Sequence, residues 1–344
     1  MSVHPIVLAS TVVDVAAALL LCWAAVTAFH VVQHWDPGQA VREQLVLESR
    51  FEVAAVLTRG AVLLYCVATA GFILAITAVL PDIVPGAMCG TGVLEATHGL
   101  GLRALLFRLL AIGALGGWRL VDSLDRSHPL SLLAKPSART LLLALPLVVL
   151  AVWETARAFA HLDPAQPVSC CTLLHEQAAS GATVGDVSGR WAVALAGSVG
   201  LLLIAAGGVL AWGGDVWRRR AGLLAAGLSL VWVGVASLAL TRGLASYHYG
   251  VLGHSCFWCL FLWEHWAVGF PLFGAIVWTA LEGLAAGLAV GIAQRFPMVA
   301  ATAHSRARRA GWRLIGGVIA YALISGLPAV VYRLRFGVWL HSSP

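Results

Sequence analysis

Two cysteines, Cys256 and Cys259, form a C-x-x-C motif, a spacing typical of proteins that exchange electrons between thiols and disulfides. Three more cysteines stand in polar segments: Cys89 alone, and Cys170 next to Cys171. Adjacent cysteines form only a strained ring with each other, so Cys170 and Cys171 are better placed to meet two different partners. The five residues could form a relay between a loop and the C-x-x-C pair, and we take them as candidate catalytic residues.

The same cysteines have a simpler interpretation as static disulfide staples. Their number is odd, so one of them would then stay a spare thiol unless a metal or another chain takes it. If the motif begins a helix, the helix dipole should lower the pKa of Cys256. Leu260, not His, follows the motif, which argues against covalent attachment of c-type haem.

A carboxylate and an imidazole follow the motif closely. If the helix continues, Glu264 and His265 lie about one to two turns beyond Cys259. Ionisable residues at that depth in a membrane are functional candidates, here for proton transfer to thiols or a quinol, or for haem or metal ligation by the histidine. Alternatively, both lie at the wet membrane surface beside an aromatic belt. The tryptophans of that belt would be Trp258, Trp263 and Trp266.

Other charges fall inside apolar segments, in the half of the membrane nearer the cysteines. They include Asp14, Arg108, Glu154 and Arg157. The spacing of Glu154 and Arg157 lets them pair on one helix face. Arg108, Glu154 and Arg157, with His161 at the segment end, are our candidate cofactor-binding residues around a substrate or quinone cavity. The alternative is a set of internal ion pairs that fixes helix packing.

Two histidines close to the C-x-x-C motif, His248 and His254, are candidate metal ligands for copper. Haem b is a second candidate cofactor, since histidine commonly ligates haem iron. Near the opposite surface, His30 and His34 share one helix face. They lack a histidine at the same depth on another helix, so we expect them to be interfacial side chains.

Arg59 and Glu282 are the remaining charges inside apolar segments, and both belong to the half of the membrane away from the cysteines. A charge at such a depth needs a partner. We therefore expect these two residues to pair with each other.

The elements that carry these residues must be membrane helices. Charged residues make up 11% of the chain and hydrophobic residues 60%, against about 25% charged residues in soluble proteins. The net charge of +6 comes from arginines clustered in a few loops, and it indicates orientation rather than nucleic-acid binding. No basic n-region opens the chain, so no cleaved signal peptide is expected.

Apolar runs predict an all-helical, polytopic membrane bundle of about eight transmembrane helices, forming a single membrane domain over residues 1–344. The seventh run is long enough that its helix must tilt, kink at Pro271 or protrude. The predicted spans are 6–33, 52–80, 103–121, 140–161, 191–214, 221–241, 257–290 and 312–334.

Most of the basic residues fall in alternate loops, which the positive-inside rule assigns to the cytoplasm. These loops are 35–50, 118–139, 218–220 and 291–313. Both termini would then lie on the outer, periplasmic face of a bacterial inner membrane. The outer loops would be 81–102, 162–190 and 242–256, and they hold the candidate cysteines.

A C-x-x-C pair at the start of a span, with further cysteines on the same face, resembles the membrane disulfide-generating enzymes of the vitamin K epoxide reductase and bacterial disulfide-bond-B type. The resemblance implies that Cys256 and Cys259 lie beside a quinone and that Cys89 shuttles electrons with Cys170 or Cys171. It covers only the cysteine-bearing segments. The chain departs from those enzymes in having more spans and an additional cysteine, so the resemblance is one of site.

We therefore expect an inner-membrane redox protein that exchanges electrons between outer-face thiols and a membrane quinone or a partner membrane or periplasmic redox protein. One alternative is a membrane subunit of a respiratory electron-transfer complex, with structural disulfides and with haem b or copper on histidines such as His161, His248, His254 or His265. Another is a small-solute or metal permease. Exchangeable cysteines favour the first function, locked disulfides the second, and thiols with bound copper the third.

The predicted orientation can be tested by labelling. A membrane-impermeant thiol reagent added to intact, reduced cells should label the cysteines of the predicted outer loops, as read by mass spectrometry of the labelled peptides. Cys22 and Cys66, inside apolar runs, should stay unlabelled and serve as internal controls. Labelling of the loop cysteines only after permeabilisation would reverse the orientation.

Overall fold

A computed structural model describes most of the chain. The described residues are 4–36, 38, 41–128, 131–162, 168, 184, 186–250, 254 and 256–340. Within them every regular element is helical, and strands are absent, as the sequence predicts.

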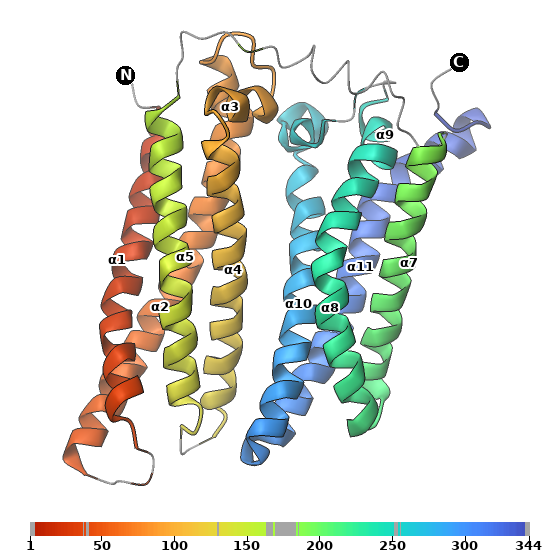
Figure 1. Ribbon diagram of the computed structural model, residues 1–344. Coiled ribbons are helices and arrows are strands. Elements are labelled where there is room, and N and C mark those ends of the chain that lie inside the picture. The colour runs from red at the N-terminus through yellow and green to blue at the C-terminus, as the bar shows by residue number, and fades with distance from the viewer. Residues whose placement is uncertain are drawn as a thin grey trace. The chain divides into compact units, whose positions relative to one another are not determined.

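The contacts divide the chain into two compact units (Figure 1). Unit 1 comprises Met1–Pro85 and Gly92–Val168, and unit 2 comprises Gly86–Thr91 and Ser169–Pro344. The short segment Gly86–Thr91, which includes Cys89, therefore packs with the C-terminal half of the chain although it follows the second long helix of unit 1.

Unit 1 is built on four long helices. In chain order it contains α1 (Pro5–His34), α2 (Arg42–Leu74), the π-helical turn η1 (Ala75–Val79), the 3-10 turn η2 (Leu80–Asp82), α4 (Leu100–Asp125) and α5 (Ala134–Ala160). The helix α1 packs against α2 and α5, and α4 packs against α5. Many of the buried core residues are alanines, which let membrane helices approach closely. The short helix α3 (Gly90–Ala96) leads into α4.

Unit 2 repeats this plan. It contains α7 (Val187–Trp212), α8 (Asp215–Ala239), the π-helical turn η3 (Leu240–Leu244), α9 (Ala245–Tyr249), the 3-10 turns η4 (Phe257–Phe261) and η5 (Trp263–His265), α10 (Gly269–Arg295), the 3-10 turn η6 (Pro297–Val299) and α11 (Ala300–Phe336). The helix α7 packs against α8 and α11, and α10 packs against α8 and α11. In both units a π-helical turn ends the second long helix and precedes a cysteine-bearing segment.

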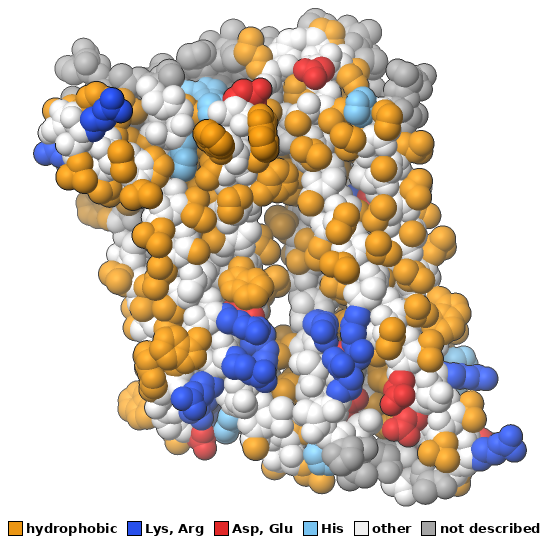
Figure 2. All heavy atoms as spheres, turned by 180° about the vertical axis from the view of Figure 1, so that it is seen from behind, with side chains coloured by type: hydrophobic (Ala, Val, Ile, Leu, Met, Phe, Trp, Pro, Cys, Tyr) orange, Lys and Arg blue, Asp and Glu red, His pale blue; other side chains and the backbone are white. Residues whose placement is uncertain are grey.

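Among the described residues, eight helices are long and apolar enough to cross a membrane, in agreement with the predicted number. Many large hydrophobic side chains of these helices are exposed, and this surface suits contact with lipid. Figure 2 shows hydrophobic side chains spread over the visible face, with Lys and Arg side chains grouped in patches.

The predicted start of the seventh span is wrong. The spanning helix α10 begins at Gly269, and the residues before it form the turns η4 and η5. Trp266 and Ala267 have φ angles of 59° and 49°, left-handed values that interrupt a helix. The C-x-x-C motif therefore lies outside the spanning helix.

The interior of unit 1 holds a charged network centred on Arg108. Arg108 is 0% exposed and pairs with Asp14 of α1, which is 1% exposed. Its Nη1 atom donates to Oδ1 of Asp14 at 3.0 Å and to Oγ1 of Thr69 at 3.2 Å. Its Nε and Nη2 atoms donate to Oγ1 of Thr155 at 3.3 and 3.1 Å, and Nη2 also bonds Oδ2 of Asp14. The network thus ties together all four long helices of the unit.

Replacing Arg108 with Met should destabilise the protein, because Asp14 would keep a buried charge without its partner. Removing one member of a buried pair costs about 3–5 kcal/mol. Thermal unfolding in detergent should therefore show a clearly lower Tm. The double variant Asp14→Leu/Arg108→Met should recover most of the loss, and Arg126→Met, at a half-exposed side chain, should change little. A single variant as stable as the wild type would show that the pair is dispensable.

Candidate functional site

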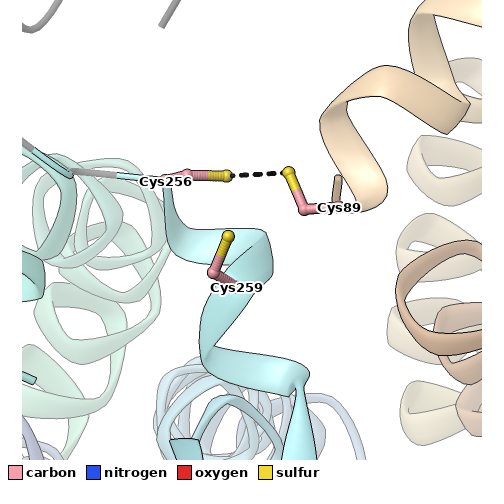
Figure 3. A group of neighbouring side chains, drawn as sticks. All are labelled: Cys89, Cys256 and Cys259. Atoms are coloured by element: carbon pink, nitrogen blue, oxygen red, sulfur yellow. Dashed lines mark hydrogen bonds between the residues drawn. The ribbon is translucent and has the colours of Figure 1, made fainter. Parts of the chain in front are cut away.

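Three cysteines from two distant parts of the chain meet in unit 2. The Sγ atoms of Cys89 and Cys256 are 3.4 Å apart, and those of Cys89, Cys256 and Cys259 all lie within 4.8 Å of one another. The three residues are 2%, 4% and 7% exposed, respectively. Figure 3 shows the side chains of Cys89 and Cys256 pointing at each other, with the sulfur of Cys259 turned toward Cys256. We call these residues the cysteine cluster.

Aromatic packing holds the two segments together. A Cβ atom at Gly90 would lie 3.1 Å from Cδ2 of Trp258, a tight contact, so glycine favours the close approach beside Cys89. Trp258 is 5% exposed and therefore belongs to the core, whereas Trp263 and Trp266 are 81% and 88% exposed. Of the predicted aromatic belt, only these last two residues lie at the surface.

The second contact of this kind fixes the C-x-x-C turn to the spanning helix. Phe261 ends the turn η4, and a Cβ atom at Gly269 would lie 2.8 Å from Cγ of its ring. Phe261 also stacks on Phe273 of α10, with ring centroids 5.4 Å apart. The apolar residues of η4 thus pack a folded turn against α10 and do not form part of a membrane span.

Hydrogen bonds within the cysteine cluster set the acidity of its thiols. Bonds from Cys259 and from Cys89 lower the pKa of Cys256 to about 3, against the effect of burial. Thr91 adds a bond between its Oγ1 atom and the Cys256 sulfur at 3.3 Å. The same bond to Cys256 raises the pKa of Cys259. Cys256 is therefore the thiolate of the cluster at neutral pH, and neighbouring donors, rather than the dipole of a spanning helix, account for this.

Cys170 and Cys171 lie outside the described residues, so their predicted bonds to Cys89 or to the C-x-x-C pair stay predictions. Within the described part of the chain, no disulfide joins the members of the cysteine cluster to one another.

Tyr249 connects the cysteine cluster to neighbouring histidines. Its hydroxyl donates to the carbonyl oxygen of Cys256 at 2.5 Å. Its ring packs edge-on against His254 and His265, with ring centroids 4.5 and 4.6 Å apart. Sequence reasoning missed Tyr249 and Thr91. The position of Tyr249 just beyond His248, in a polar segment before the motif, was the available signal for the tyrosine.

A continuous seventh span predicts that Glu264 and His265 lie inside a spanning helix. The structure instead places both residues before that helix begins. They belong to the turn η5, where Glu264 is exposed and His265 is partly exposed. Together with His248 they line a cavity of about 280 Å³, whose other wall comes from α11. The described structure thus places Glu264 and His265 at the edge of the helical part of unit 2.

Among the described residues, the one group of three or more His, Cys, Asp and Glu side chains able to share an ion is the cysteine cluster, and it includes neither His248 nor His254. A role of these two histidines as metal ligands stays a prediction. The Nε2 atom of His248 is buried and has no hydrogen-bond partner in the described part of the chain.

The candidate cofactor-binding residues belong to unit 1, whereas the cysteine cluster belongs to unit 2. Arg108 has all five guanidinium donors engaged, so the Asp14 network accounts for its burial without a ligand. Arg157 pairs with Glu154 at 2.9 Å, as its i, i+3 spacing predicts. His161 is exposed at the end of α5. A cofactor role for these residues stays a prediction.

The predicted pair between Arg59 and Glu282 is wrong. Arg59 bonds Asp122 within unit 1 at 3.0 Å. Glu282 bonds Arg306 and Arg313 of α11 at 2.8 and 3.2 Å. Similar depth in the membrane did not indicate which helices are neighbours.

In comparisons with known proteins, no protein family, no curated protein and no solved structure matches this chain.

The low pKa of Cys256 can be measured by alkylation. With the cysteines reduced, iodoacetamide should modify Cys256 at nearly the same rate at pH 6 and pH 8, because a group with a lowered pKa stays ionised as the pH falls. In the Cys89→Ala/Cys259→Ala variant the sulfur donors are gone, and the rate should fall about tenfold per pH unit below the ordinary thiol pKa. Peptide mass spectrometry at timed intervals gives both rates. A tenfold fall per unit in the wild type would contradict the assignment of the thiolate.

Proposed function

We propose that this protein exchanges electrons between thiols and disulfides at the cysteine cluster and passes them to or from a membrane quinone or a partner redox protein. The observation that supports this most is the position of Cys256, whose sulfur has one neighbour in its own segment, Cys259, and one in a distant segment, Cys89. The 3.4 Å between Cys89 and Cys256 needs only a small shift to reach the disulfide bond length of about 2.05 Å.

The exchange needs two bond-making steps at one sulfur. When Cys89 is bonded to a partner cysteine and the C-x-x-C pair is reduced, the Cys256 thiolate attacks Cys89, and the partner leaves as a thiolate. Cys259 then loses its proton, which the departing thiolates can take up, and its sulfur attacks Cys256. A bond between Cys256 and Cys259 forms, and the sulfur of Cys89 leaves. The C-x-x-C pair loses two electrons, and the partner disulfide gains them. The reverse sequence carries electrons into the pair.

Burial supports this role. Thiol–disulfide exchange depends on thiolate character and on access, and a buried cluster restricts attack to partners that the surrounding segments admit. The donors around Cys256 supply the thiolate character. The buried position of all three sulfur atoms limits the access.

The cysteine cluster also favours a second candidate function, a copper-holding membrane subunit or permease. Three sulfur atoms within 4.8 Å of one another could surround one ion, and thiolates select soft ions such as Cu(I). The two functions differ in what happens to the cysteines. Exchange requires them to form disulfides in turn, whereas copper binding requires them to remain thiolates.

The alternative of a respiratory subunit that holds haem b is tested by an absorption spectrum of the purified protein, because haem b gives a Soret band.

Trapping tests the exchange directly. Cys259→Ser removes the residue that releases Cys89, so a disulfide between Cys89 and Cys256 should accumulate during oxidation. Mass spectrometry of non-reduced peptides should find this bond in most molecules, and in a small fraction of the wild type. Cys22→Ser, far from the cluster in sequence and exposed, is the matched control.

Two results would contradict the exchange function. One is the absence of this mixed disulfide under every oxidising condition. The other is stoichiometric Cu(I) bound by the reduced wild type, lost in Cys256→Ser, with no disulfide in protein isolated aerobically.

A further inference from the structure

We infer that the cavity beside the cysteine cluster binds the head group of a membrane quinone, and that this quinone takes the two electrons that the C-x-x-C pair releases. The inference rests on the proposed thiol–disulfide exchange and names its electron acceptor. It assigns the cavity residues His248, Glu264 and His265 to a binding site.

The two walls of the cavity differ in chemistry. Its volume is about 280 Å³, and α11 supplies an aliphatic wall that includes Leu323 and Leu327. These leucines are 59% and 57% exposed on a helix able to span the membrane, so they face the region that lipid occupies. The opposite wall carries His248, Glu264 and His265. A ligand that fits must reach the cavity from lipid and present polar atoms to the histidines.

One buried polar atom in this wall lacks a hydrogen-bond partner within the described part of the chain. The Nε2 atom of His248 is buried and has no hydrogen-bond partner among the described residues. A buried polar atom without a partner costs about 1–3 kcal/mol. A carbonyl oxygen of a quinone would accept a hydrogen bond from the protonated nitrogen, and a quinol hydroxyl would donate to the unprotonated one. A phospholipid acyl chain would fill the aliphatic side but leave this atom unsatisfied.

The size of the cavity also favours a single ring. Pockets that enclose a whole drug-sized ligand have volumes of about 300–1,000 Å³. A cavity of about 280 Å³ lies just below this range. It suits one substituted ring, and the isoprenoid tail of a quinone would extend along the exposed leucines of α11.

Tyr249 places the cavity next to the cysteine cluster. Its ring lies against His265, a cavity residue, and its hydroxyl holds the backbone of Cys256. In addition, the turns η4 and η5 are separated by one residue, so one short segment carries both the C-x-x-C pair and two residues of the polar wall, Glu264 and His265. A ring in the cavity would therefore lie one aromatic side chain away from the segment that holds the thiols.

The reaction balances with the quinone as oxidant. The Cys256 thiolate and the Cys259 thiol lose two electrons and one proton, and a bond forms between their sulfur atoms. The quinone gains these two electrons, takes one proton from Cys259 and one from solvent, and becomes a quinol. His248 and His265 line the cavity and can relay the protons to the quinone oxygens.

The test uses purified full-length protein in lipid vesicles, with reduced cysteines and a short-tailed ubiquinone or menaquinone analogue. Quinone reduction is followed by absorbance without oxygen, and a photoreactive azido-quinone maps the binding site. The azido-quinone should label η5 or α11. His248→Ala should raise the KM for the quinone about tenfold, the loss expected for one hydrogen bond. His304→Ala, at a histidine that contacts Asp215, is the matched control and should leave the KM unchanged.

The outcomes separate the acceptor from the exchange itself. Wild-type exchange with a small disulfide is measured without quinone. If that exchange occurs but no quinone is reduced, or if the azido-quinone labels only other helices, the quinone site is wrong and the exchange function stands. If the azido-quinone labels the cavity but the cysteines neither exchange nor oxidise, the electron-transfer role fails together with the proposed function. An unchanged KM in both His248→Ala and His265→Ala would also overturn the site.

Discussion

The rest of the structure depends on how charge is held inside the helical units. Lipid offers no hydrogen-bond partner, so each polar group at that depth needs a partner in the protein. Arg108 meets this requirement with all five donors, and its acceptors, together with Arg108 itself, come from every long helix of unit 1. In unit 2, Glu282 joins α10 to α11 through Arg306 and Arg313. Charges inside the units therefore act first as links between helices.

This constraint places the candidate chemistry outside the spanning helices. Non-helical backbone is tolerated at membrane depth only where protein or water satisfies it, so the irregular segments between helices are the places for a reactive cluster. Both second helices end in a π-helical turn, a feature frequent at functional sites, and a cysteine-bearing segment follows each one. Cys89 and Cys256 thus occupy corresponding places in the repeated order of elements.

The sequence was sufficient to predict the number of spans, because long apolar runs are a strong signal. It was insufficient to predict the structure of residues 256–268, since the apolar residues that pack a 3-10 turn cannot be distinguished by type from those of a membrane helix. Trp266 and Ala267 adopt left-handed backbone conformations, although neither is a glycine, the residue type that would indicate such a conformation in the sequence. The distribution of charge predicts that the cysteines share one face, but it does not predict that Cys89 meets Cys256, a contact that accompanies the packing of Trp258 on Gly90. Such contacts depend on tertiary shape, which a single sequence does not reveal.

The lowered pKa of Cys256 also bears on the direction of electron flow. Donors from Cys259, Cys89 and Thr91 stabilise the thiolate, which exists only in the reduced cluster. A stabilised reduced form makes the corresponding disulfide a better oxidant. In the proposed exchange, the bond between Cys256 and Cys259 would therefore draw electrons from partner thiols through Cys89. The reduced pair would then need an acceptor more oxidising than an ordinary dithiol. In the proposed quinone site, a lipid-soluble quinone would be such an acceptor, and the cavity that would hold it has aliphatic side chains of α11 in its wall.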